Sequence, residues 1–263
     1  EAGKEYHKQK PGSVMTVDFS LGGHGFTALN GGPMFRPNPS ISFFVNCTQA
    51  AEVDRCWNAL APAGKVLVPL DSYPFSKRYG WVEDKFGVSW QLFLSEGPVS
   101  QRIMPCLLFV GERCGRAEEA MKFYADVFQD SRIAAASRYG EGNAPNEPNN
   151  LNYGEVVLRD YHLVVMDSAL DHQFGFTEGV SLIIDCEDQA EVDHYWERLS
   201  AVPEAEACGW LKDRFGVSWQ VAPSEFYELV GDGSSEVAQR VMSAMMPMKK
   251  LDIDALRRAA GAR

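Results

Sequence analysis

One phrase that contains a serine, a tryptophan and a glutamine occurs twice in this sequence. It reads GWVEDKFGVSWQL at residues 80–92 and GWLKDRFGVSWQV at residues 209–221, with nine of thirteen positions identical. Side chains alternate between the two faces of a strand, so we expect the tryptophan and its apolar neighbours on one face and the remaining residues on the other. That second face carries polar and aromatic side chains: Ser89, Gln91 and Phe93 in the first copy, and Ser218 and Gln220 in the second.

A glutamine in this position indicates binding by hydrogen bonds. Its amide offers N–H donors and an oxygen acceptor, and it carries no charge. Gln91 and Gln220 therefore suit a neutral or weakly polar ligand, or a partner group contributed by the other copy. We expect both to point into a concave face, because the alternating Trp90 and Trp219 belong against helices.

Four more residues are candidates for lining that face. Trp81 and Trp210 follow a glycine where the chain enters the phrase, and each is either a cavity-wall aromatic or a packing lid over a helix. Cys106 is a nucleophile or soft ligand on a predicted strand, or a buried thiol that packs as a small hydrophobe. His162 either faces the cavity or is an ordinary strand-end residue.

Aspartate and glycine positions in these segments have structural interpretations. Asp84 and Asp213 each come two residues before Phe-Gly, where an aspartate typically caps a turn. The glycine-rich segment LGGHGF (21–26) predicts a hairpin turn, and no helix pattern follows it, as an S-adenosylmethionine site would require. No G-x-S-x-G motif of a serine hydrolase occurs. We predict no cofactor.

The repeat extends upstream of the phrase. ISFFVNCTQAAEVDRCWNALA (41–61) matches VSLIIDCEDQAEVDHYWERLS (180–200) at an offset of 139. Val53, Trp57 and Leu60 form one helical stripe, which predicts an amphipathic helix. The first copy has ten additional residues between this helix and the phrase.

Two predicted hairpins precede these helices. The repeat aligns VDFSLGGHGFTALN (17–30) with EVVLRDYHLVVMD (155–167), and each segment shows two apolar runs around a turn. The second copy alone begins with a strand at 104–111, a helix at 116–128 and a strand at 131–140. Each copy is therefore read as strand, helix, strand, hairpin, helix and final strand. For the first copy we expect either residues before Glu1 or coverage by a second chain.

Three regions are predicted. The first module spans residues 1–98 and the second 103–230, and a helical tail spans 234–263. The tail contains a Met-rich helix and a second helix that begins near Asp252. Such helices usually pack on their own chain or form a dimer, so a homodimer is one alternative.

Composition limits the partners. The chain has 263 residues and a formal net charge of −11, which disfavours binding to the phosphates of nucleic acid. No apolar run approaches the roughly 20 residues of a membrane helix, so no membrane partner is expected. The six cysteines form no C-x-x-C pair, and we interpret them as reduced thiols of a cytoplasmic protein.

Several motifs together resemble the PhnB-like branch, labelled 3-demethylubiquinone-9 3-methyltransferase, of the glyoxalase/bleomycin-resistance (vicinal oxygen chelate) superfamily. They are PCLLFVG…AEEAMKFY, VDFSLGG…FTALNGGP, VNC…EVDRCWNAL, GW-x-x-D-x-FGVSWQ and QRVMSAMMPMKKLDIDALRRA. The resemblance implies an α+β fold of two tandem βαβββ modules with mixed sheets that form a cup. It also implies a metal held by His and Glu from first and last strands. Gln91 and Gln220 stand where the last-strand Glu is normal, and Met104–Cys106 where the first-strand ligand would be, so we predict no metal.

The sequence favours a non-metal protein that binds a small molecule in the paired cup. One alternative is a metal-dependent lyase, isomerase or dioxygenase of the same superfamily. Another is an interaction protein whose cup is filled by side chains. Methyl transfer is disfavoured because no S-adenosylmethionine motif occurs.

Overall fold

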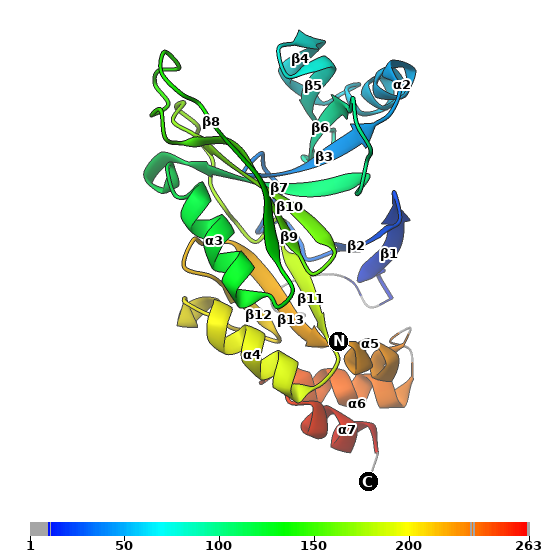
Figure 1. Ribbon diagram of the computed structural model, residues 1–263. Helices are drawn as coiled ribbons and strands as arrows, with labels where there is room; N and C mark the ends of the chain where they lie inside the picture. The colour runs from blue at the N-terminus through cyan, green and yellow to red at the C-terminus, as the bar shows by residue number, and fades with distance from the viewer. Residues whose placement is uncertain (1–9, 11, 232, 234, 262–263) are drawn as a thin grey trace. The chain divides into compact units, whose positions relative to one another are not determined.

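The computed structural model describes residues 10, 12–231, 233 and 235–261 (Figure 1). The outer ends of the predicted first module and of the predicted tail, residues 1–9, 11, 234 and 262–263, lie outside this part of the chain. Contacts divide the chain into two compact units. The eight-stranded unit comprises residues 16–29 and 36–179, and the three-stranded unit comprises residues 180–261 with shorter upstream segments.

One mixed sheet of eight strands dominates the larger unit. Its strand order is β4-β5-β6-β3-β7-β10-β9-β8. The strands are β3 (Ile41–Cys47), β4 (Lys65–Tyr73), β5 (Ser76–Glu83), β6 (Ser89–Leu94), β7 (Ile103–Val110), β8 (Arg132–Arg138), β9 (Leu151–Leu158) and β10 (Tyr161–Ser168). The sheet joins two βαβββ segments, one from each copy of the repeat, through antiparallel pairing of β3 with β7.

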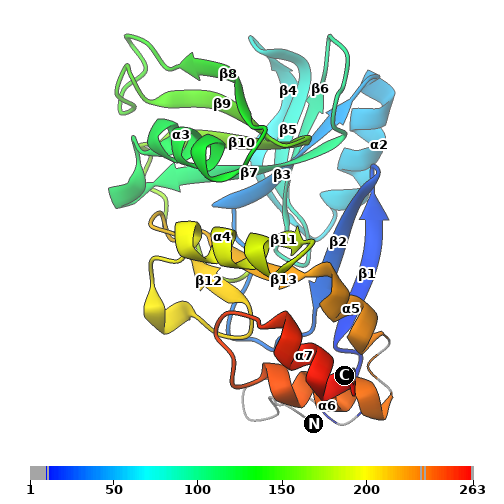
Figure 2. The same cartoon turned by 60° about the horizontal axis from the view of Figure 1, so that its bottom comes forward.

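Two helices cover one face of this sheet. Helix α2 (Ala50–Leu60) packs on β5 and β6, and α3 (Ala117–Val127) packs on β9 and β10 (Figure 2). Val53 of α2 is fully buried and forms a cluster with Cys47 and Leu92, against which Trp57 of α2 and Trp90 of β6 both pack. The Trp57 ring approaches Gly80 so closely that a Cβ there would lie 2.5 Å from it, which explains the glycine that opens the phrase. Trp90 therefore packs on the helical side, as its alternation predicts.

The predicted hairpins are confirmed. Strands β1 (Thr16–Leu21) and β2 (His24–Leu29) pair around Gly22 and Gly23, so LGGHGF is a hairpin turn. The equivalent hairpin is β9–β10, with Arg159 and Asp160 at its turn. Strand β1 pairs with β2 alone in the described sheets, whereas β10 and β9 are also flanked by β7 and β8.

The order of elements read from the sequence omits a strand before the second helix of each copy. β3 and the equivalent β11 (Leu182–Cys186) fill these places. β3 is nearly all buried because neighbouring strands and side chains cover both of its faces, which removes the alternation that marks a half-exposed strand. The ten additional residues of the first copy belong to the β4–β5 hairpin, where the second copy has only a 3₁₀ turn, η2 (Pro203–Ala205), and β12 (Trp210–Lys212).

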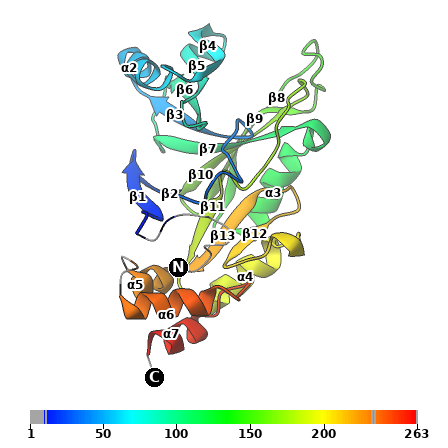
Figure 3. The ribbon, with the colours of Figure 1, turned by 180° about the vertical axis from the view of Figure 1, so that it is seen from behind.

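The three-stranded unit repeats the second half of this pattern. β13 (Ser218–Pro223) pairs in parallel with β11 and antiparallel with β12, and α4 (Gln189–Leu199) packs on β13. Three helices follow, α5 (Ser224–Val230), α6 (Glu236–Met245) and α7 (Ile253–Ala260) (Figure 3). The tail prediction is confirmed: Asp252 caps α7 by accepting a hydrogen bond from the Ala255 amide. Helix α5 has no equivalent in the prediction.

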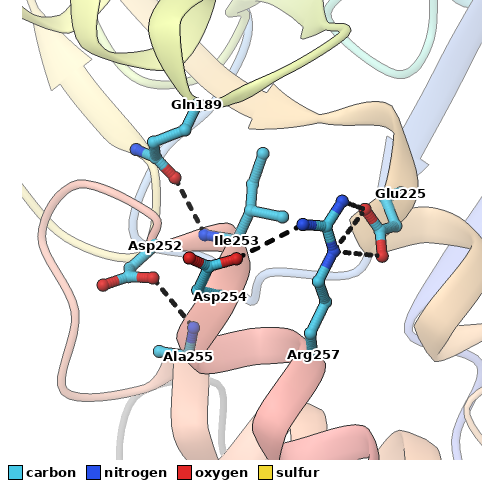
Figure 4. A network of polar contacts seen from close by, with 7 residues as sticks. All are labelled: Gln189, Glu225, Asp252, Ile253, Asp254, Ala255 and Arg257. Carbon is cyan, nitrogen blue, oxygen red and sulfur yellow. Dashed lines mark hydrogen bonds and ion pairs between the residues drawn. The ribbon is translucent and has the colours of Figure 1, made fainter. Parts of the chain in front are cut away.

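Polar side chains tie the tail helices to α4 and to one another. Gln189 accepts a hydrogen bond from the Ile253 amide at 2.9 Å and donates to the carbonyl of Leu251 at 3.1 Å. Arg257 of α7 forms a forked ion pair with Glu225 of α5 (Figure 4). A cavity of about 330 Å³ lies beside these groups. The N-termini of α4 and α7 beside this cavity are already capped by the carboxylates of Asp188 and Asp252. We therefore interpret the cavity as a gap in the packing between helices and not as a binding site.

The repeated phrase builds the same turn twice. Asp84 Oδ1 accepts hydrogen bonds from the amides of Phe86 and Val88, and its Oδ2 accepts one from Trp90 Nε1. Asp213 forms the same three bonds with the amides of Phe215 and Val217 and with Trp219 Nε1. The turn-capping role predicted for both aspartates is confirmed. Each also holds the tryptophan that follows, which explains why the whole phrase recurs.

All six cysteines are free thiols. Cys47 and Cys186 are fully buried at equivalent strand ends, in agreement with core packing. Among the described residues, no helix combines the length and apolar character needed to cross a membrane.

Candidate functional site

The candidate site of the larger unit is the sheet face opposite α2 and α3. Strand register places most of the predicted ligand-contact residues on this face: Trp81, Ser89, Gln91, Phe93, Cys106 and His162. The face is concave. Strands β7 and β10 separate Phe44 from Tyr153, a span of about 14 Å in a flat sheet, yet their ring centroids are 6.2 Å apart.

Gln91 lies at the floor of this face and is fully buried. Its Oε1 accepts a hydrogen bond from the Tyr79 hydroxyl at 2.6 Å, and its Nε2 donates to Ser42 Oγ at 2.8 Å. Beside it, Trp81 Nε1 donates to Ser89 Oγ at 2.6 Å. The polar groups of the floor are thus satisfied from within the unit, which rigidifies the face.

Cys106 faces the same floor and is fully buried. Desolvation raises the pKa of its thiol to about 12, although hydrogen bonding to Ser42 and Gln91 acts in the opposite direction. The thiol therefore stays protonated near neutral pH. A protonated, buried thiol is neither a nucleophile nor a good metal ligand, so the structural interpretation of Cys106 is the one that its surroundings favour.

An acid–base group flanks the floor on β9 and β10. His162 Nδ1 lies 2.5 Å from Glu155 Oε1, and the Tyr153 hydroxyl donates to Glu155 Oε2 at 2.7 Å. A carboxylate accepts hydrogen bonds, so Nδ1 carries the proton in this contact. Burial is the main reason that the pKa of Tyr153 is raised, and the bond to Glu155 adds to it. Glu155 thus orients the His162 ring, and Tyr153 holds Glu155 on the concave face.

The metal site implied by the resemblance does not fit these residues. Register aligns four residues across the central strands, Ser89, Ser42, Cys106 and Val164, beside the uncharged amide of Gln91. Two of them are uncharged polar groups, one is a protonated thiol and one is an aliphatic side chain, whereas divalent metals prefer imidazole and carboxylate. Across the described residues, no group of three or more His, Cys, Asp or Glu side chains is placed to hold a metal ion.

The three-stranded unit carries the equivalent positions in a more open state. Gln220 Nε2 donates to Ser181 Oγ at 2.8 Å, which matches the Gln91–Ser42 bond of the first copy. Ser218 Oγ is buried and has no hydrogen-bond partner in the described structure. Trp210 and Gln220 are half-buried.

Sequence reasoning missed four residues of the two polar groups: Ser42, Tyr79, Tyr153 and Glu155. Alternation along the hairpin 155–167 places Glu155 on the concave face, so this residue could have been predicted from the sequence. Tyr79 precedes Gly80, outside the repeated phrase, and its partner Gln91 is on the neighbouring strand. No periodicity in the sequence connects them.

Comparison with known proteins identifies a family and several similar solved structures. The family model described as 3-demethylubiquinone-9 3-methyltransferase matches residues 1–93 and 101–222. A putative 3-demethylubiquinone-9 3-methyltransferase, PhnB protein, from Bacillus cereus is 32% identical over 47% of this chain and 100% of its own, with a TM-score of 0.40.

Two further structures are similar over different lengths. A Staphylococcus aureus protein is 37% identical over 33% of this chain and 66% of its own, with a TM-score of 0.21. Glyoxalase I from Zea mays is 10% identical over 80% of this chain and 78% of its own, with a TM-score of 0.49. No curated protein matches the chain. The two matched segments cover most of the sequence, and the chain therefore belongs to the family described as 3-demethylubiquinone-9 3-methyltransferase.

Proposed function

We propose that this chain is a metal-independent small-molecule-binding protein of its superfamily. The observation that carries the proposal is the Gln–Ser pair present in both copies. Gln91 donates to Ser42 and Gln220 donates to Ser181, each at 2.8 Å. The pair holds each amide in place; that of Gln91 is completed by the Tyr79 hydroxyl, and that of Gln220 offers neutral hydrogen bonding where a metal-binding relative needs a charged ligand.

The half-buried aromatic side chains support binding of a ligand with apolar surface. Trp81, Phe93 and Tyr153 pack around the buried cluster of Phe44, Tyr79 and Met104 and remain partly exposed. Apolar walls with a few fixed polar groups are typical of small-molecule sites. The ligand that suits such a face is neutral and contains at least one ring or aliphatic body.

Methyl transfer, which the family description names, has less support in this chain. The glycine-rich segment LGGHGF lies at the β1–β2 turn rather than between a strand and a helix. The backbone amides of a helix N-terminus, which bind such cofactors in the classic nucleotide-binding turn, are therefore missing at this segment.

One observation favours a second candidate, an interaction protein with a filled cup. Gln91, Cys106 and Val164 on the concave face are all completely buried. In that case the floor is core, and only the rim of the face is available to a partner. A homodimer is one form of this candidate. The six free thiols support a cytoplasmic location for either candidate.

Metal analysis tests the proposal. Protein purified without chelator should contain well under one equivalent of transition metal. Replacing both glutamines, Gln91→Glu and Gln220→Glu, should raise the affinity for zinc, because carboxylates suit the geometry of the superfamily site. Stoichiometric metal in the wild type that is lost in Gln91→Ala or Gln220→Ala would support the metalloenzyme instead. A thermal-shift screen in which no neutral small molecule raises the Tm would favour the filled cup.

A further inference from the structure

We propose that the face of β11, β12 and β13 around Gln220 binds a small aromatic molecule through a ring hydroxyl. This inference rests on the proposed small-molecule function and assigns it to the second copy of the repeat. It is carried by a comparison of the two copies, which share the Gln–Ser pair but differ in what completes it.

The amide oxygen is saturated in one copy and open in the other. In the first copy, the Tyr79 hydroxyl donates to Gln91 Oε1 at 2.6 Å. Cys208 takes the place of Tyr79 in the second copy, and its Sγ faces the carbonyl of Met246 at 3.5 Å. No described residue donates a hydrogen bond to Gln220 Oε1, so this acceptor is available to a ligand.

The serine hydroxyl two residues before each glutamine likewise has a hydrogen-bond partner in the first copy and no described partner in the second. Ser89 Oγ accepts a hydrogen bond from Trp81 Nε1, and both residues have equivalents in Ser218 and Trp210. Ser218 is 1% exposed, and its Oγ has no partner in the part of the chain that the structure describes. Leaving a buried hydroxyl unpaired costs about 1–3 kcal/mol, which a bound polar group would recover.

Within the described residues of the three-stranded unit, the surface beside Gln220 is exposed. Ile183 is 41% exposed, whereas Phe44, its equivalent next to Gln91, is 6% exposed. Trp210 on β12 and Ile183 on β11 are the register partners of Gln220, and Trp210 is half-buried, so an indole and an aliphatic side chain flank the amide. Asp185 lies on the same face as Ile183 and disfavours an anionic ligand.

The first copy shows which chemistry fits. Its amide oxygen is occupied by a phenol hydroxyl, and the ring that carries this hydroxyl packs among aromatic neighbours, with Phe93 at 6.5 Å. The second copy provides the same acceptor and no internal phenol. A neutral aromatic ring with an O–H donor is therefore the ligand class that completes it.

Phenol itself is the probe. Titration of ¹⁵N-labelled full-length chain with phenol should shift the signals of the Gln220 side-chain amide and the Trp210 indole and yield a Kd. Anisole has the same ring without a donor and should bind at least tenfold more weakly. Gln220→Leu should weaken phenol binding at least tenfold, whereas Gln239→Leu, the same change at an exposed glutamine of α6, should leave it unchanged.

The outcomes separate this inference from the broader proposal. Equal affinity for phenol and anisole, or an unchanged Kd in a folded Gln220→Leu variant, would overturn the hydroxyl-binding role of Gln220 while leaving small-molecule binding intact. Shifts confined to the eight-stranded unit would also overturn it. Stoichiometric bound metal in the purified chain would overturn the broader proposal, whatever phenol does.

Discussion

The two aspartates of the repeated phrase allow the same three hydrogen bonds to be compared at two degrees of burial. Asp84 and Asp213 accept the same three hydrogen bonds, with the indole bond at 3.0 Å in one and 2.9 Å in the other. Asp213 is completely buried, whereas Asp84 is half-exposed. We consider replacing each by asparagine, which keeps the size and one carbonyl oxygen.

The expected loss of stability follows from the hydrogen-bond acceptors that asparagine retains. Its Oδ1 can still accept from the two backbone amides, but its Nδ2 then meets the indole N–H, and two donors face each other. A hydrogen bond to a charged group contributes about 1.5–3 kcal/mol, and a buried donor left unpaired adds a penalty. We expect Asp213→Asn to cost about 2–3 kcal/mol. Asp84→Asn should cost about 1 kcal/mol, because water can solvate the freed indole.

Amide hydrogen exchange is the suitable assay, because the chain forms two compact units and one global unfolding transition is not assured. The reporters are the amides of Val217 and Val88, which donate to the two aspartates. Since each 1.4 kcal/mol is a factor of ten, exchange at Val217 should accelerate about 30-fold to 150-fold in Asp213→Asn. Asp160→Asn, in the exposed β9–β10 turn, is the control. Losses that agree within about 0.5 kcal/mol at the two sites would refute the argument that burial sets the cost.

Three further predictions concern packing, pH and the tail. Trp219→Ala should destabilise its unit by about 3–5 kcal/mol, because Trp219 is 2% exposed, and Trp90→Ala should cost less, because Trp90 is half-buried. Equal losses of amide-exchange protection in the two units would contradict this. Burial raises the pKa of both Cys47 and Cys106 from 9.0 to about 12. These thiols therefore stabilise the fold below pH 9, and that contribution should be lost as the pH rises toward 12. A Cys47→Ala/Cys106→Ala variant with the same alkaline melting curve as the wild type would count against it. Gln189→Ala removes the bonds to Leu251 and Ile253 and should cost about 1–2 kcal/mol, seen as faster proteolysis near α7, whereas Gln239→Ala should have no effect.

Much of the local structure could be predicted from the sequence because short-range rules govern it. Alternation placed Gln91 opposite Trp90, and the packing of Trp90 against the α2 cluster confirms that assignment. The turn signals in LGGHGF and around Asp84 and Asp252 also gave the correct local structure. In each case the hydrogen-bonded partners lie within a few residues, so the sequence contains the whole interaction.

Only the tertiary structure decided how strands from different copies combine and what covers each face. Pairing of β3 with β7 depends on strand edges that periodicity does not encode, and it builds one sheet from both copies of the repeat. Phe86 and Phe215 occupy identical positions in the phrase, yet one is 74% exposed and the other is fully buried. In the same way, the Tyr79 hydroxyl donates to the amide oxygen of Gln91, whereas no described residue donates to the amide oxygen of Gln220. A repeated sequence determines repeated local geometry, but burial depends on neighbours that are distant in the chain, and these differ between the two copies.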